Sequence, residues 1–193
     1  MKIACFHLMP YRDLDDDFEK KYPSSWFSLP FSEVADRQKV SQYFNWTLDE
    51  LTFAAESGFD GVCTNEHHQN AYGFMVNPNL MGSVLARATR GTDTAIIQMG
   101  ETAVFLNPPI RVAEEYAMLD AISEGRLVAG FPVGLGGDFS YSYGMAPMEQ
   151  RARYYEAHDL IKKAWTATEG FAWNGTYYQL PMVNIWPQPF QQP

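Results

Sequence analysis

The chain has 193 residues, of which 46% are hydrophobic and 19% are charged, a balance typical of globular proteins. Its net charge of −9 argues against a nucleic-acid-binding surface, because phosphate binding requires a clustered basic face. No apolar run approaches the ~20 residues of a membrane span, and the short apolar start lacks a signal-peptide cleavage site, so we expect a cytoplasmic protein without a membrane partner.

Short apolar runs of strand length alternate with helical patterns along the chain. The predicted strands cover residues 3–9, 61–64, 94–99 and 127–131. The last three begin about 33 residues apart, a spacing that suits β/α units. The alternation predicts an α/β fold in which right-handed crossovers join the strands of a parallel sheet.

Each predicted strand is followed by a helical pattern. Thr47 and Glu50 match a capping box, so the first helix is predicted to begin there and to end at Gly58. Asn77 before Pro78 predicts an N-cap followed by proline in the first turn of the second helix. The remaining two helices are predicted over residues 109–125 and 149–165.

Two segments depart from this alternation. Residues 11–46 are predicted to form a long loop with an acidic run and an aromatic cluster, which favours a lid over an apolar substrate or a disordered segment. Residues 170–193 contain Asn174-Gly175 between aromatic-rich runs, which predicts a hairpin. Cys5 and Cys63 lie inside apolar runs, and we expect two buried thiols rather than a disulfide.

Four β/α units make up half of an eight-stranded barrel, and we interpret the chain as a single domain of this type. A half-barrel leaves two strand edges unpaired and one sheet face uncovered. We therefore expect the sheet to close by another route, to pair with a second copy in a homo-oligomer, or to be the N-terminal half of a longer barrel whose fifth to eighth strands are missing here.

The residues able to do chemistry follow the strands directly. They are His7, the run Asn65-Glu66-His67-His68, Gly100-Glu101, and the segment 132–137 with Gly134. Because the carboxyl ends of parallel strands share one edge of the sheet, these residues predict a small-molecule site there.

The adjacent histidines His67 and His68 raise two alternatives. Metal binding is disfavoured, because neighbouring side chains of an extended chain point apart and the i, i+4 histidine pair of zinc enzymes is absent. The pair then either forms a hydrogen-bonded turn or belongs to a catalytic site. The glycines around Gly134 allow either a close approach of ligand to backbone or a flexible loop, and they do not form a P-loop.

Three long stretches resemble the bacterial-luciferase-like family of flavin-dependent monooxygenases. They are "GFDGVCTNEHHQNAYGFMVNPNL", "NPPIRVAEEYAMLDAISEGRLVAGFPVG" and "YEAHDLIKKAW", and the tail resembles the family's insertion after the fourth helix. The resemblance implies a β/α barrel that binds reduced FMN, or in one branch F420, at the C-terminal rim.

The resemblance also implies roles for single residues. His67 matches a histidine near the flavin, and Glu66 matches the carboxylate before it, so both are candidate catalytic residues. Gly100 and Glu101 match a position beside the flavin ring where luciferase has a cis peptide. Luciferase has an arginine where this chain has Val133, a departure that favours a general monooxygenase over light emission.

We therefore expect a monooxygenase that uses reduced FMN, O₂ and a flavin reductase to oxygenate a small, mainly apolar substrate. His67 and Glu66 are the expected catalytic residues, and His7, Gly100, Glu101 and Gly134 the expected cofactor-binding residues, with no metal. The alternatives are hydride transfer with F420 on the same fold, and a non-catalytic flavin-binding or structural half-barrel.

Overall fold

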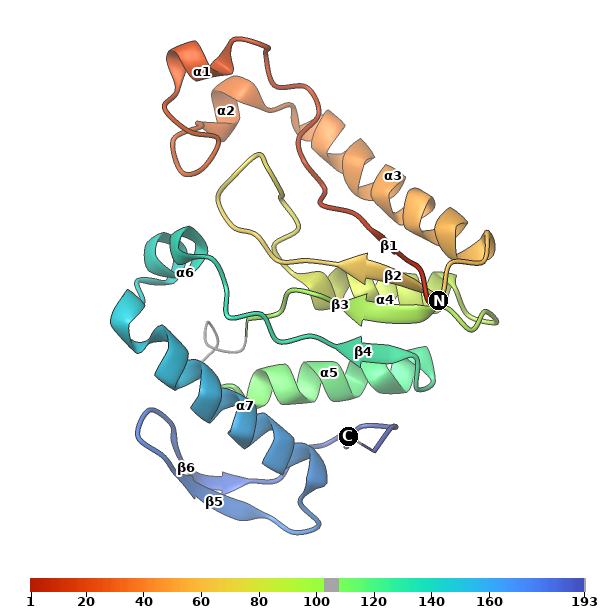
Figure 1. The fold of residues 1–193 in the computed structure, drawn as a ribbon, viewed down its shortest axis with the longest axis vertical. Coiled ribbons are helices and arrows are strands. Elements are labelled where there is room, and N and C mark those ends of the chain that lie inside the picture. Colours follow the sequence, from red (N-terminus) through yellow and green to blue (C-terminus); the bar gives the residue numbers. More distant parts are fainter. Residues whose placement is uncertain (103–107, 193) are drawn as a thin grey trace.

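Four parallel strands form one sheet in the order β1-β2-β3-β4 in this computed structural model, which describes residues 1–102 and 108–192 (Figure 1). The strands are β1 (Ala4–Phe6), β2 (Gly61–Thr64), β3 (Ala95–Gln98) and β4 (Leu127–Ala129). In register, Ala4 lies opposite Gly61, Gly61 opposite Ala95, and Ile96 opposite Leu127. The predicted α/β fold is confirmed, and β2 has the predicted bounds while the other strands are shorter.

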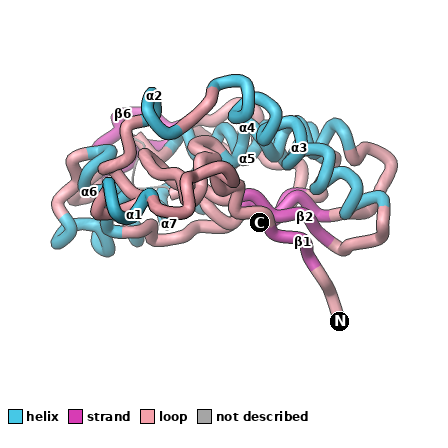
Figure 2. The backbone as a smooth tube through the Cα atoms, turned by 90° about the horizontal axis from the view of Figure 1, so that it is seen from above, coloured by secondary structure: helices cyan, strands magenta, loops and turns pink. Residues whose placement is uncertain are grey.

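Long helices connect and cover the strands. They are α3 (Arg37–Glu56), α4 (Pro78–Ala88), α5 (Ile110–Ser123) and α7 (Gln150–Thr166). Figure 2 shows α3, α4 and α5 on one side of the sheet. Shorter helical segments are α1 (Phe18–Lys21), α2 (Phe31–Val34), α6 (Gly136–Tyr143) and the 3-10 helix η1 (Pro147–Glu149).

The predicted capping box was wrong, because α3 begins at Arg37 and not near Thr47. The side chain of Asp36 caps this helix by accepting hydrogen bonds from the backbone N–H groups of Gln38 (2.6 Å) and Lys39 (3.4 Å). Thr47 is instead a buried residue in mid-helix, on the face that also buries Leu51. The predicted loop 11–46 is therefore helical from Arg37 onward, and it contains α1 and α2.

The predicted start of α4 and the predicted end of α5 are confirmed. The Asn77 side chain accepts a hydrogen bond from the Leu80 N–H at 2.8 Å, with Pro78 in the first turn of α4. At the end of α5, Glu124 and Gly125 both have positive φ, of 58° and 83°. Glycine adopts this left-handed conformation without the steric cost that Cβ imposes, as the prediction required.

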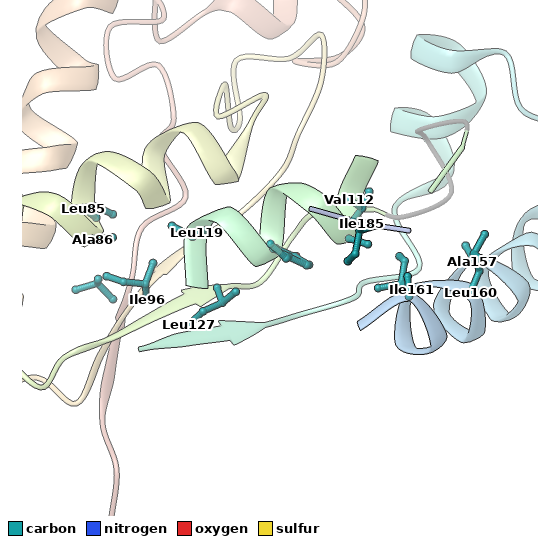
Figure 3. Packing of buried hydrophobic residues seen from close by; sticks show 14 of the residues in the cluster. Leu85, Ala86, Ile96, Val112, Leu119, Leu127, Ala157, Leu160, Ile161 and Ile185 are labelled. Atoms are coloured by element: carbon teal, nitrogen blue, oxygen red, sulfur yellow. The ribbon is translucent and has the colours of Figure 1, made fainter. Parts of the chain in front are cut away.

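The main core lies between the helices and one sheet face. Figure 3 shows Ile96 and Leu127 of the sheet packed near α4 and α5, with Ile161 of α7 in the same cluster. On the opposite sheet face Phe6, Met99 and Val128 are about half exposed, at 50%, 51% and 48%. The sheet is thus covered on one face within the described part of the chain.

Arg126, at the start of β4, ties together the N-terminal ends of the strands. Its guanidinium donates hydrogen bonds to the carbonyl oxygens of Ala86, Thr94 and Ser123 and to the Thr89 hydroxyl, at 2.8–2.9 Å. These acceptors belong to α4 and the loop that follows it, to the segment before β3, and to α5. One side chain at the start of β4 therefore satisfies carbonyl groups of the two preceding β/α units.

The tail forms the predicted hairpin, from β5 (Phe171–Asn174) and β6 (Gln179–Val183), which lies beside α7 in Figure 1. The Glu156 carboxylate of α7 accepts hydrogen bonds at 3.0 Å from the backbone N–H groups of Thr176, Tyr177 and Tyr178. Both cysteines are free, with Cys63 buried and Cys5 only partly so. Within residues 1–102 and 108–192, no helix combines the length and apolar character needed to span a membrane.

Candidate functional site

The C-terminal ends of β1 to β4 surround a cavity of about 320 Å³, which we call the rim cavity. Each strand contributes the residues that directly follow it or end it. The lining residues are Phe6, Asn65, Glu66, His67, Met99, Gly100, Thr102, Pro132, Val133, Gly134, Leu135 and Asp138. The strand ends thus bring His67, Glu66, Gly100 and Gly134 together around one space.

His67 is held from several sides. Its Nδ1 lies 3.2 Å from Oδ2 of Asp138, and its backbone N–H donates to the Met75 carbonyl at 3.1 Å. The Tyr72 ring packs edge-on against the imidazole, and a Cβ on Gly73 would lie 2.9 Å from its Cδ2. An ionised carboxylate can only accept a hydrogen bond, so Asp138 in that form selects the His67 tautomer with the proton on Nδ1 and leaves Nε2 without one.

Asp138, in the first turn of α6, is only 2% exposed and anchors both histidines of the run. Its Oδ1 accepts a hydrogen bond from the His68 backbone N–H at 3.0 Å, while Oδ2 meets the His67 ring. Both oxygens of this buried carboxylate therefore have a hydrogen-bond partner on the His67-His68 run. Sequence reasoning missed this residue, because it lies nine positions after the end of β4, inside α6, where no local pattern marks it.

The side chain of His68 has different partners from that of His67. Its Nε2 lies 2.8 Å from Oε1 of Glu66, and the Tyr143 hydroxyl is 3.4 Å away. The second oxygen of Glu66 accepts a hydrogen bond from the Thr102 backbone N–H at 2.7 Å, so it joins the ends of β2 and β3. In the part of the chain that the structure describes, no three His, Cys, Asp or Glu side chains gather as metal ligands would.

Gly100 lines the rim cavity, where the segment after β3 passes close to the segment after β2. A Cβ at this position would collide with the backbone of Asn65 and Glu66, so only glycine fits here. Among the described residues, the cis peptide bond is between Trp186 and Pro187, so the bond between Gly100 and Glu101 is trans.

Glu101 turns away from the rim cavity and is 6% exposed. It borders a smaller cavity of about 100 Å³ with Arg111 and Glu115, and the Asn79 side-chain amide donates to both glutamates. Burial raises the pKa of Glu101 to about 9, and the neighbouring carboxylates of Glu115 and Glu66 add to the shift. Burial alone would raise the pKa of Glu115, but hydrogen bonds from Arg111 and Asn79 hold it below its ordinary value.

His7 and Gly134 have different surroundings. The His7 ring faces α3, with Nε2 at 2.8 Å from Oε2 of Glu50, and it is not among the residues lining the rim cavity. Gly134 does line the cavity, with a φ of 90°, and its carbonyl accepts a hydrogen bond from Gln150 at 3.3 Å. The glycine run predicted as a loop or ligand contact becomes helical at Gly136.

A family model described as luciferase-like monooxygenase matches residues 24–193. The chain belongs to this family. The relationship inferred from the sequence is thereby confirmed.

Several members of the family are similar over most of this chain. The oxygenase component of a flavin-dependent trigonelline monooxygenase from Acinetobacter baylyi is 32% identical over 169 residues, which are 83% of this chain and 44% of the relative. The alkanal monooxygenase beta chain of Vibrio harveyi is 26% identical, over 86% of this chain and 50% of the relative.

A solved structure shows the same arrangement in three dimensions. The crystal structure of monooxygenase RslO1 from Streptomyces bottropensis aligns with a TM-score of 0.77 at 26% identity, over all of this chain and 51% of that one. The chain spans about half the length of these relatives. The predicted barrel-type fold with four β/α units is confirmed.

The rim cavity suits the ring system of a flavin. Its walls are largely apolar, and a few polar groups face it, which is typical of cofactor sites. Asn65 supplies a buried side-chain oxygen with no hydrogen-bond partner among the described residues, although its amide nitrogen donates to the His7 carbonyl at 2.6 Å. No Lys or Arg is among the described lining residues, so none of them offers a cationic partner to a phosphate group.

Proposed function

We propose that this chain forms part of a flavin-dependent monooxygenase that oxygenates small, mainly apolar organic molecules. Reduced FMN from a partner reductase would supply two electrons, so that one atom of O₂ enters the substrate and the other leaves as water. The observation that carries the proposal is the His67–Asp138 pair in the rim cavity. Membership of the family, and the flavin-dependent monooxygenase among the relatives, support it.

In this proposal, the residues of the chain bind, orient and move protons. Phe6, Met99 and Leu135 would contact the flavin ring and exclude water from it. His67 would take up and release a proton at Nε2, because imidazole does so near neutral pH. Asp138 would keep the opposite nitrogen protonated and fix the plane of the ring.

Glu66 has a positioning role in this proposal. It bonds to His68 on one side and to the Thr102 backbone on the other, so it would fix the ends of β2 and β3 around the flavin. Gly100 lets those ends approach each other, and Gly134 borders the same space.

The first experiment titrates the protein with FMN and, in parallel, with F420, following flavin or deazaflavin fluorescence. Tight FMN binding supports the proposal, whereas binding of F420 alone would replace it with hydride transfer. Turnover is then measured with NADH, a flavin reductase, O₂ and a panel of apolar substrates.

The second experiment compares His67→Ala with His158→Ala, a control on α7 away from the rim cavity. We expect His67→Ala to lower the yield of oxygenated product per NADH by roughly a hundredfold, in line with the loss of a general acid–base group. Unchanged coupling in that variant would remove His67 from the mechanism. FMN binding without turnover, together with a dimer by sedimentation, would favour a non-catalytic flavin-binding half-barrel.

A further inference from the structure

A second cavity lies between the segment 11–40 and the loop 69–76, and we call it the N-terminal cavity. Its volume is about 320 Å³, which falls in the range of small-molecule sites. Its walls are mainly aromatic and aliphatic, and include Phe27, Leu29, Phe31, Val34, Phe74 and Val76. None of the described lining residues carries a charge.

Backbone hydrogen bonds fasten the segment over the loop. Tyr11 N–H donates to the Ala71 carbonyl at 2.8 Å, Phe27 N–H donates to the Gln69 carbonyl at 2.8 Å, and Ala71 N–H donates to the Ser25 carbonyl at 3.2 Å. Main-chain bonds of this kind hold the walls at a fixed separation. The cavity is therefore formed before any ligand arrives, which lowers the cost of binding.

Two residues at this junction have an unusual backbone. Phe27 has a φ of 58° and Gln69 a φ of 52°, and the two are joined by one of these hydrogen bonds. The left-handed region is rare for residues other than glycine, asparagine and aspartate, and such outliers concentrate at ligand and active sites. Both residues line the N-terminal cavity, so the strained backbone of Phe27 and Gln69 lies in the wall of this cavity.

Aromatic contacts connect this cavity to the rim cavity. The ring of Tyr72 lies between Trp26 and His67, with centroid distances of 6.3 Å and 5.3 Å. The Phe27 ring lies 4.8 Å from that of Tyr141 on α6, the helix that carries Asp138. Phe27, a lining residue of the N-terminal cavity, thus packs against the helix that supplies Asp138 to the rim cavity.

We propose that the N-terminal cavity binds a neutral, largely apolar small molecule whose single hydrogen-bonding group is received by Gln69. A charged ligand would lose its hydration without a compensating partner in the walls. Gln69 is exposed at the cavity, and its side-chain amide makes no hydrogen bond within the described residues, so it can donate to or accept from a ligand. That the ligand is the substrate to be oxygenated rests on the proposed function, whereas the binding itself does not.

The test uses two probes of nearly equal size, 4-phenyl-2-butanone and 3-phenylpropanoate, with isothermal titration calorimetry on the whole protein. The ketone is expected to bind, and the carboxylate is expected to bind at least about tenfold more weakly. Ala35→Leu and Ala71→Leu each place extra volume in the cavity, and each should weaken ketone binding at least about tenfold. Ala152→Leu, on an exposed position of α7, is the matched control and should change nothing.

A photoreactive diazirine analogue of the ketone gives a second readout in the unaltered protein, in case the leucine variants fold poorly. Labelling within residues 27–35 or 69–76, mapped by mass spectrometry, supports the proposal. The proposal is overturned by labelling only elsewhere, by equal affinity for the carboxylate, or by ketone affinity that both folded leucine variants leave unchanged.

FMN titration of the same samples separates this proposal from the proposed function. Ketone binding without FMN binding would keep the N-terminal cavity as a ligand site and refute the flavin monooxygenase. FMN binding without ketone binding would support the flavin monooxygenase and overturn the N-terminal cavity as a ligand site.

Discussion

Oδ2 of Asp138 lies 3.2 Å from Nδ1 of His67, so an acid on α6 orients a histidine 71 positions earlier in the chain. The same carboxylate holds the backbone of His68 through its other oxygen. Asp138 therefore fixes both the path of the chain and the tautomer of the ring at the rim cavity.

Asp138→Asn is expected to preserve the fold and to impair oxygenation. The new amide can still accept from the His68 N–H, but its NH₂ group would donate to Nδ1 of His67 and so move the ring proton to Nε2. We expect the product formed per NADH to fall roughly tenfold to a hundredfold, with FMN affinity changed far less. Rapid mixing of reduced, FMN-loaded protein with O₂ and substrate measures this directly.

Asp159→Asn, at an exposed position of α7, is the control for that experiment. A merely structural role for Asp138 would appear as a loss of FMN binding and of thermal stability together, with no change in the pH profile of coupling. That result would contradict the orienting role.

Glu101 makes stability depend on pH in a defined direction. Because its pKa is raised to about 9, the folded protein keeps a proton there that the unfolded chain releases above its ordinary pKa of 4.5. The folded state thus binds more protons, and the free energy of unfolding falls as pH rises between these values, by at most about 1.4 kcal/mol per pH unit. This contribution is fully lost only above pH 9.

Glu101→Gln keeps a neutral group that can bond to Asn79 and Glu115, and it removes the titration. Relative to the parent protein, we expect this variant to gain stability steadily from pH 5 to pH 8, as measured by urea unfolding. Glu169→Gln, at an exposed position, should follow the parent curve. Parallel curves for the parent and Glu101→Gln would show that Glu101 is already ionised in the folded protein.

The start of α3 can be tested with two substitutions of opposite effect. Asp36→Ala removes the observed N-cap and should destabilise the protein by about 1 kcal/mol. Thr47→Val should be neutral or stabilising, because the Thr47 hydroxyl is buried without a hydrogen-bond partner among the described residues. Urea unfolding measures the stability of both variants. If Thr47→Val destabilised the protein more than Asp36→Ala, the capping box at Thr47 would be supported instead.

Gly100→Ala should destabilise the protein and weaken FMN binding, because the added methyl group collides with the backbone of Asn65 and Glu66. Overpacking of this kind costs about 1–3 kcal/mol. Gly170→Ala is the comparison, since its methyl group would come closer than 3.0 Å only to the flexible side chain of Met182 and would make ordinary contacts with Asn184 and Val183. If urea unfolding showed equal stabilities for the two variants, the close approach of β2 and β3 would not depend on Gly100.

Local patterns in the sequence predicted the strands, the start of α4 and the end of α5, because apolar runs, Asn77-Pro78 and Gly125 act through neighbouring residues. The start of α3 was misplaced because Thr47 and Glu50 match a capping box locally, whereas the burial of Thr47 in mid-helix is visible only in the folded chain.

For the candidate site, too, the sequence predicted what depends on local patterns and did not predict what depends on tertiary contacts. Of the residues that follow the parallel strands, His67, Glu66, Gly100 and Gly134 line the rim cavity, whereas His7 and Glu101 do not. The pairing of His67 with Asp138 joins distant parts of the chain, and the orientation of Glu101 away from the cavity depends on Asn79 and Glu115. Neither has a local signature in the sequence.

Arg126 has a consequence for how this protein can change over time. It joins neighbouring β/α units at the N-terminal ends of the strands, opposite the rim cavity, through hydrogen bonds that involve none of the residues lining either cavity. Insertions, deletions and exchanges in segments such as 11–40 could then accumulate without loss of the fold. The set of ligands can therefore change through substitutions in these loops, while the Arg126 hydrogen bonds that join the β/α units are retained.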